Sequence, residues 1–164
     1  MDIQTRTIPE RRLAVISQEL FQPQLDEFIP AAFGDLFEWA QRRPGVRALN
    51  TTPDEPTYVI FHGPVTPQAS ALVEVCAVIR SDAEPEGRIA LRTEDQHEEA
   101  FTSITREQLE FPHILGAYDA VAMWVMQNGS MIESMPGREV YFADVMSEPM
   151  DALVCDVTFP FVRH

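Results

Sequence analysis

The pattern of apolar and polar positions divides the chain into short extended runs and two longer helical segments. Three runs, Leu13–Ser17, Tyr58–Phe61 and Ala71–Arg80, are rich in β-branched and aromatic residues and are bounded by Pro, Gly or polar residues. This composition is typical of strands. From about Phe28 to Arg43 the apolar period becomes that of a helix, which Pro44 and Gly45 then end.

The first helix has one apolar face and an aromatic residue next to it. Its apolar face is predicted to consist of Phe33, Leu36, Phe37 and Ala40. Trp39 lies beside this face, so we expect it to be available to line a pocket. Pro30 fits the first turn, where its missing N–H is not needed.

The second helix, Phe111–Asn128, is apolar on nearly every side, and Asp119 is its only acid. Two interpretations remain open. The helix is buried between a sheet and the other half of the molecule, or part of its surface, with Tyr118 and Trp124, lines a pocket.

The second half of the chain repeats the order of the first. The matches are Ile3–Thr7 with Ile89–Thr93, Ala14–Ser17 with Ala100–Ser103, Pro30–Gly34 with Pro112–Gly116, and Val73–Val75 with Cys155–Val157. Each half reads strand, helix, strand, strand. We therefore predict one domain over residues 1–164, built from a tandem duplication with repeats at about 1–82 and 83–164. Its class is α+β, with pseudo-twofold symmetry, mainly antiparallel sheet and a central cleft between the halves.

Charge and composition exclude several classes of protein. With 12 basic and 26 acidic residues the net charge is −14, which argues against direct binding to nucleic acid. No apolar run is long enough for a membrane span, and the N-terminus lacks an apolar signal core, so we expect a cytoplasmic location and no membrane partner. Cys76 and Cys155 lie in apolar runs and are predicted to be buried hydrophobic residues.

The run Met135–Asp144 carries one acid, Glu139, among apolar and aromatic neighbours. Strand alternation places Glu139 and Tyr141 on one face and Val140 and Phe142 on the other. Glu139 is either exposed on an edge strand, or buried beside an aromatic ring, where an unpaired carboxylate marks a functional site. We take Tyr58 as its counterpart in the first half.

Other chemistry has little support. The histidines show no spacing for a metal site, and no nucleophile or phosphate-binding motif is present, so we expect no metal and no cofactor. The acidic clusters Asp82–Glu86 and Glu94–Glu99 are interpreted as solvated loops, with His97-Glu98-Glu99 a solvated turn.

Five segments together resemble the GyrI-like, or effector-binding, domain family of bacterial multidrug-sensing transcription regulators. They are Ile8–Val15, Tyr58–His62 followed by Ala71–Ile79, Ala117–Trp124, Gly137–Tyr141 and Asp156–Pro160. The resemblance implies two βαββ units related by a pseudo-twofold axis. It also implies that Glu139 pairs with cationic, lipophilic ligands in an aromatic pocket with Tyr141, Tyr118, Tyr58 and Trp124 as walls. The chain departs from the family pattern at Thr158, where a tyrosine is frequent, and at Ile104–Leu109, which lacks a glycine.

Three functions follow from the resemblance. The first is a small-molecule-binding protein that senses or sequesters a ligand. The second is an enzyme that hydrolyses strained electrophilic, cyclopropane-type compounds, with Glu139 as general base and Tyr141 or Tyr118 as proton partner. The third is a protein that inhibits DNA gyrase through its acidic surface. A role in transcription requires a separate DNA-binding regulator as partner, and the sequence does not define the ligand or the oligomeric state.

Overall fold

The computed structural model describes residues 1–164 and contains one antiparallel sheet of nine strands with two helices. The strand order is β1-β6-β9-β8-β3-β4-β2-β5, and β7 also pairs with β9. The strands are β1 (Gln4–Ile8), β2 (Arg11–Leu20), β3 (Thr57–Phe61), β4 (Ala71–Ile79), β5 (Ala90–Glu94), β6 (His97–Thr105), β7 (Gly129–Met131), β8 (Arg138–Tyr141) and β9 (Leu153–Arg163). The helices are α1 (Leu25–Gln41) and α2 (His113–Asn128), and the 3-10 turns are η1 (Gln22–Gln24) and η2 (Val145–Ser147).

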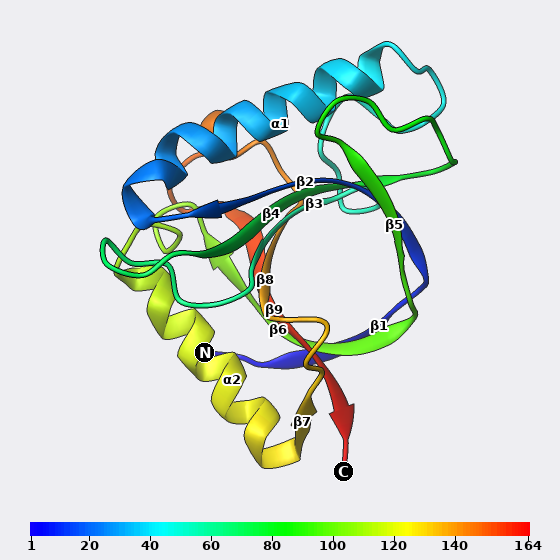
Figure 1. Cartoon of the computed structure of the whole chain (residues 1–164). Helices are drawn as coiled ribbons and strands as arrows, with labels where there is room; N and C mark the ends of the chain where they lie inside the picture. Colours follow the sequence, from blue (N-terminus) through cyan, green and yellow to red (C-terminus); the bar gives the residue numbers. More distant parts are fainter.

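The sheet curls into a closed ring. β1 runs into β2 across Pro9 and Glu10, and β5 runs into β6 across Asp95 and Gln96. β1 pairs with β6 while β2 pairs with β5, so these two bent strands join the ends of the sheet. Figure 1 shows the resulting ring, with both helices outside it. The sheet therefore has an outer face, which the helices cover, and an inner face, which lines the ring.

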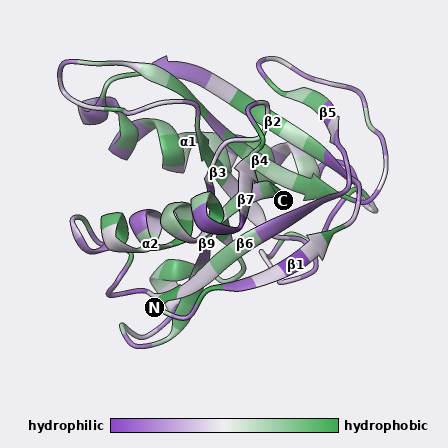
Figure 2. Ribbon diagram, turned by 90° about the horizontal axis from the view of Figure 1, so that it is seen from below, coloured by the Kyte–Doolittle hydropathy of each residue, from purple (hydrophilic) through white to green (hydrophobic).

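Most of the hydrophobic core lies between the outer face and the helices. α1 packs on β2 and β4 with a buried face of Phe28, Ala32, Leu36, Trp39 and Ala40. Figure 2 shows β4 as hydrophobic over most of its length, and eight of its nine residues are buried. α2 packs on β6 and β9 in a second cluster that contains Cys155. Both Cys76 and Cys155 are free and buried, as predicted.

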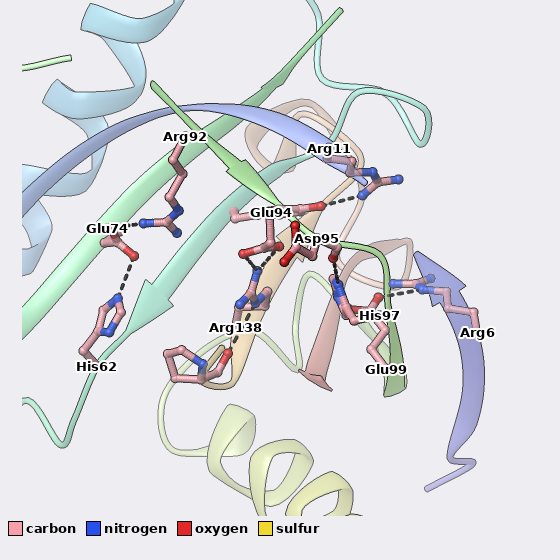
Figure 3. A network of polar contacts seen from close by, with 12 residues as sticks. Arg6, Arg11, His62, Glu74, Arg92, Glu94, Asp95, His97, Glu99 and Arg138 are labelled. Atoms are coloured by element: carbon pink, nitrogen blue, oxygen red, sulfur yellow. Dashed lines mark hydrogen bonds and ion pairs between the residues drawn. The ribbon is translucent and has the colours of Figure 1, made fainter. Parts of the chain in front are cut away.

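The inner face combines a small apolar cluster with buried ion pairs. Arg138 donates to both carboxylate oxygens of Glu94, at 2.6 and 2.8 Å, and Arg6 bonds Glu99 at 2.8 Å. Figure 3 shows these pairs inside the ring, with His97 next to Glu99. The expectation that Glu94–Glu99 is a solvated loop is therefore wrong at Glu94, His97 and Glu99, which are all buried.

The predicted class, α+β with a mainly antiparallel sheet, is confirmed by the structure. α1 begins at Leu25, earlier than expected, so Pro30 lies inside the helix rather than in its first turn. Internal duplication of the sequence stays a prediction. Neither helix is both long enough and apolar enough to cross a membrane.

Candidate functional site

Glu139 lies near the middle of the sheet, on the face that the helices cover. β8 is hydrogen-bonded on both sides, to β3 and to β9, so it is not an edge strand. Arg138 and Val140 face the inside of the ring, whereas Glu139 and Tyr141 face the helices, as strand alternation requires. Glu139 is only 8% exposed. The interpretation of Glu139 as an exposed acid on an edge strand is therefore wrong.

Two tyrosine hydroxyls hold the Glu139 carboxyl group. Tyr118 of α2 donates to Oε2 at 2.6 Å, and Tyr141 donates to Oε1 at 2.5 Å. Burial raises the pKa of Glu139, and the two hydrogen bonds oppose that rise. Burial, followed by the nearby Glu139 charge, raises the pKa of both tyrosines well above its ordinary value. The tyrosines therefore remain protonated donors at neutral pH.

Aromatic rings fix the positions of both tyrosines. Tyr118 meets the ring of Phe159 edge-on at 6.1 Å between centroids, and Tyr141 meets Phe33 of α1 at 6.5 Å. A Cβ atom at Gly137 would lie 2.6 Å from Phe159 Cε1. The glycine just before β8 thus leaves the space that the ring supporting Tyr118 occupies.

Glu139 and Tyr118 line a cavity of about 620 Å³ beside the first turns of both helices. Its walls are mostly apolar, and its other lining residues are Gln22, Pro23, Leu25, Asp26, Phe61, Gly63, Pro64, Val65, Leu109, Phe111, Ile114 and Leu115. The lining contains two carboxylates, Glu139 and Asp26, but no arginine and no histidine. The chain contains no lysine at all. We refer to this space as the Glu139 cavity.

The structure brings three of the six predicted binding residues together, namely Glu139, Tyr118 and Tyr141. Tyr58 pairs with Val140 and lies on the inner face, where Arg11 bonds its hydroxyl. Tyr58 therefore lies on the opposite face of the sheet from Glu139, whose cross-strand partner in β3 is Val59.

The two tryptophans lie away from the cavity. Trp39 is 1% exposed within the core under α1, because the buried face of α1 includes it. Trp124 packs edge-on against Phe161, with 5.5 Å between ring centroids. Neither residue lines the Glu139 cavity, in contrast to the expectation from the sequence.

Sequence reasoning missed the apolar residues at the cavity entrance. Phe111 and Leu115 are 70% and 47% exposed, and both line the cavity with Phe61. The signal in the sequence was the absence of charged residues in the first turns of the second helix. No group of three or more His, Cys, Asp or Glu residues is arranged to hold a metal ion.

Known structures share this architecture at low sequence identity. The chain is similar to EcmrR in an EcmrR–DNA complex (TM-score 0.78, 16% identity), covering 99% of this chain but only 58% of EcmrR. It is also similar to the EcmrR C-terminal domain, with a TM-score of 0.75 and 17% identity, over 99% of this chain and 98% of that domain. These matches show the fold, and the chain spans little more than half the length of EcmrR.

Two further similar structures are described by a bound ligand or by an activity. SAV2435 bound to tetraphenylphosphonium matches with TM-score 0.60 and 14% identity over 99% of this chain and 94% of that one. A hydrolase from Listeria innocua matches with TM-score 0.58 and 10% identity, over 98% of this chain and 91% of the hydrolase. No curated protein matches the sequence.

The family itself is shown by a sequence model rather than by these structures. The model of the GyrI-like small molecule binding domain matches residues 1–162, which is nearly the whole chain. The ring-shaped sheet, the two covering helices and the cavity between their first turns belong to a domain of that description. The chain is a member of the GyrI-like small molecule binding domain family.

Proposed function

We propose that the chain binds lipophilic cations in the Glu139 cavity, with Glu139 as the counter-ion. The observation that carries the proposal is a buried carboxyl group held by two tyrosine hydroxyls and contacted by no cationic side chain. Elsewhere in the chain the buried acids each pair with an arginine, namely Glu55, Glu74, Glu94, Glu99 and Asp156. Glu139 is the exception among the buried acids, and it faces a cavity.

The walls determine which cations fit. Apolar side chains form most of the cavity wall, so a small hydrated cation would lose its water with little replacement. A cation that carries its charge within an apolar body loses less hydration and also buries apolar surface against Phe61, Leu115 and Ile114. The tyrosine and phenylalanine rings add cation–π contacts. SAV2435, which shares the fold, is a protein whose structure contains tetraphenylphosphonium, a cation of this class.

Titration with tetraphenylphosphonium tests the proposal. We expect Glu139→Gln to weaken binding by about 10- to 150-fold, since a contact with a charged group contributes about 1.5–3 kcal/mol. Gln has nearly the shape of Glu and can still accept a hydrogen bond from a tyrosine, so the cavity should keep its form.

Asp26→Asn is the matched control, because Asp26 is the other acid in the lining but is exposed to solvent. It should change the affinity by less than the Glu139 variant does, since water screens its charge. Equal affinity of the wild type and Glu139→Gln for tetraphenylphosphonium would refute the proposal, as would a complete lack of binding by a folded wild type.

The second candidate function is hydrolysis of strained electrophiles, and the raised pKa of Glu139 favours it. A general base works best when its pKa approaches the working pH, and the Tyr118 and Tyr141 hydroxyls lie within hydrogen-bond distance of this carboxyl group. Incubation with a cyclopropane-bearing electrophile separates the two functions. Turnover that is lost in Glu139→Gln supports the enzyme, whereas binding without turnover supports the binding protein.

Protein partners form the third part of the proposal. The net charge of −14 supports binding to a basic surface, and DNA gyrase or a separate DNA-binding regulator, both acting in the cytoplasm, are the proposed partners. A supercoiling assay with purified gyrase tests the first of these, and unchanged supercoiling at a large excess of the chain excludes it.

A further inference from the structure

A second cavity, of about 410 Å³, lies on the inner face of the sheet, behind the Glu139 cavity. β8 separates the two, because Glu139 lines the first cavity and the next residue, Val140, lines the second. The walls of this inner cavity come from β1, β2, β6, β8 and β9, together with the loop before β3 and the residue that follows β8. The residues that matter for its chemistry are Arg6, Arg11, Phe101, Ser103, Phe142 and Asp156.

Both carboxylate oxygens of Asp156, the one acid in the inner cavity, already have partners within the chain. Asp156 Oδ2 accepts a hydrogen bond from Arg6 Nη1 at 2.8 Å, and Oδ1 accepts one from Ser103 Oγ at 2.5 Å. Arg6 also bonds Glu99 at 2.8 Å, and the His97 ring lies 3.7 Å from the same carboxylate. Figure 3 shows Arg6, Glu99 and His97 grouped together in this way. Each carboxylate oxygen of Asp156 thus already accepts a hydrogen bond, so a ligand would meet little free negative charge from this acid.

Arg11 is different from every other arginine in the chain. Nine of the twelve arginines form ion pairs with carboxylates. Two of the others, Arg47 and Arg106, donate to backbone carbonyl groups. Arg11 makes neither kind of bond, and its single hydrogen bond runs to the Tyr58 hydroxyl at 2.5 Å. Figure 3 shows Arg11 with this single bond, whereas Arg6, Arg92 and Arg138 are joined to carboxylates.

The bond to Tyr58 orients Arg11 without neutralising it. Tyr58 is 3% exposed, and burial raises its pKa although Arg11 lowers it, so the phenol stays uncharged. A guanidinium has a planar fork of N–H donors that matches a carboxylate, and one of these donors is used here. Arg11 therefore offers a full positive charge and free donors at the wall of a cavity.

We propose that the inner cavity binds a small organic anion, namely a carboxylate on a planar apolar body, with Arg11 as its counter-ion. Phe142, Pro53 and Pro56 supply apolar wall, and the Phe101 ring carries the Arg6 guanidinium 3.9 Å from its centroid. The net charge of −14 repels anions at long range. At about 0.15 M salt this repulsion is screened beyond about 8 Å, so the local pairing with Arg11 decides binding.

A titration with 2-naphthoate, followed by amide NMR spectra of the whole chain, tests this proposal. We expect shifts around Ser103, Val140 and Phe142 and none confined to the Glu139 cavity. Arg11→Gln should weaken binding at least tenfold, equivalent to about 1.4 kcal/mol. Arg11→Lys should recover part of the affinity, because it restores the charge but not the fork. Uncharged 2-naphthylmethanol should bind at least tenfold more weakly than 2-naphthoate.

Three results would overturn the proposal. They are equal affinity of Arg11→Gln and wild type for 2-naphthoate, equal affinity of the wild type for the acid and the alcohol, and displacement of 2-naphthoate by tetraphenylphosphonium from a shared site. If Arg11→Gln does not fold, the shift map and the alcohol comparison on the wild type still decide. Glu139→Gln should leave 2-naphthoate binding unchanged, so failure of the cation proposal and failure of this one give different results.

Discussion

The affinity for a lipophilic cation should depend on pH through Glu139. Burial raises the pKa of this carboxyl group in the free protein, against the opposing effect of the two tyrosine hydrogen bonds. In the proposed mode of binding the cation pairs with the carboxylate form, so protons and ligand compete for the same group. As the pH falls through the pKa of Glu139, affinity should fall by at most tenfold per pH unit. The midpoint should lie above about 4.3, the ordinary value for a glutamate.

The structure also sets the upper and lower limits of the affinity as the pH changes. Tyr118 and Tyr141 keep their protons over the whole range because their pKa values are raised well above the ordinary one. At high pH the affinity should reach a plateau set by the carboxylate. At low pH it should approach the affinity of Glu139→Gln, about 10- to 150-fold weaker, because a protonated glutamate and a glutamine are both neutral.

Isothermal titration with tetraphenylphosphonium from about pH 4 to about pH 8 measures this profile, since the charge of the probe does not titrate. The Glu139→Gln variant should give a flat profile across the same range. Asp26→Asn should keep the slope, because Asp26 is the exposed acid of the cavity. A flat profile for the wild type, or a Glu139→Gln variant with the wild-type slope, would show that Glu139 is not the counter-ion.

Three further predictions concern stability. Arg138→Met should lower the free energy of unfolding in urea by about 3–5 kcal/mol, since it leaves the buried Glu94 without its cation, and adding Glu94→Gln should recover most of the loss; a single variant as stable as wild type contradicts this. Gly137→Ala should lower the melting temperature and weaken tetraphenylphosphonium binding, because the added methyl group meets an aromatic ring 2.6 Å away, whereas Gly116→Ala, with nothing within 4 Å, should not. Glu139→Gln should be more stable than the wild type at about pH 7.5 but not at about pH 4. The folded-state pKa of Glu139 is raised, so the wild type loses stability as the pH rises above the unfolded-state pKa. A variant that is no more stable than the wild type at either pH would contradict a buried, charged Glu139.

Local patterns in the sequence predicted the elements of the fold well. The α2 segment, β3 and β4 lie within a few residues of their expected bounds, because each has a clear period or a clear bounding residue. The alternation along β8 correctly separated Glu139 and Tyr141 from Val140. Alternation alone does not tell which face of β8 lies under the helices, because this depends on how β8 pairs with the strands on either side of it.

The errors arose where a side chain's environment depends on distant partners. Glu94 was interpreted as solvated because acids usually are, but its partner Arg138 lies 44 residues further along the chain. Tyr58 was assigned to the pocket although the pairing of β3 with β8 sends it to the inner face. Trp39 was placed beside the apolar face of α1, whereas the helix contacts β2 and β4 through a face that includes it.

β8 places a structural charge and the proposed ligand-binding charge on opposite faces of one short strand. Arg138 and Glu139 are neighbours in sequence, and both are buried, at 1% and 8% exposure. Arg138 faces the ring interior, where Glu94 neutralises it, so its removal should damage the fold. Glu139 faces the helices, where both of its hydrogen-bond donors are hydroxyl groups and no cation of the chain pairs with it, so its charge disfavours folding. A cation bound in the cavity would provide the positive charge that no side chain of the protein places beside Glu139. Binding should therefore raise the melting temperature of the wild type more than that of Glu139→Gln.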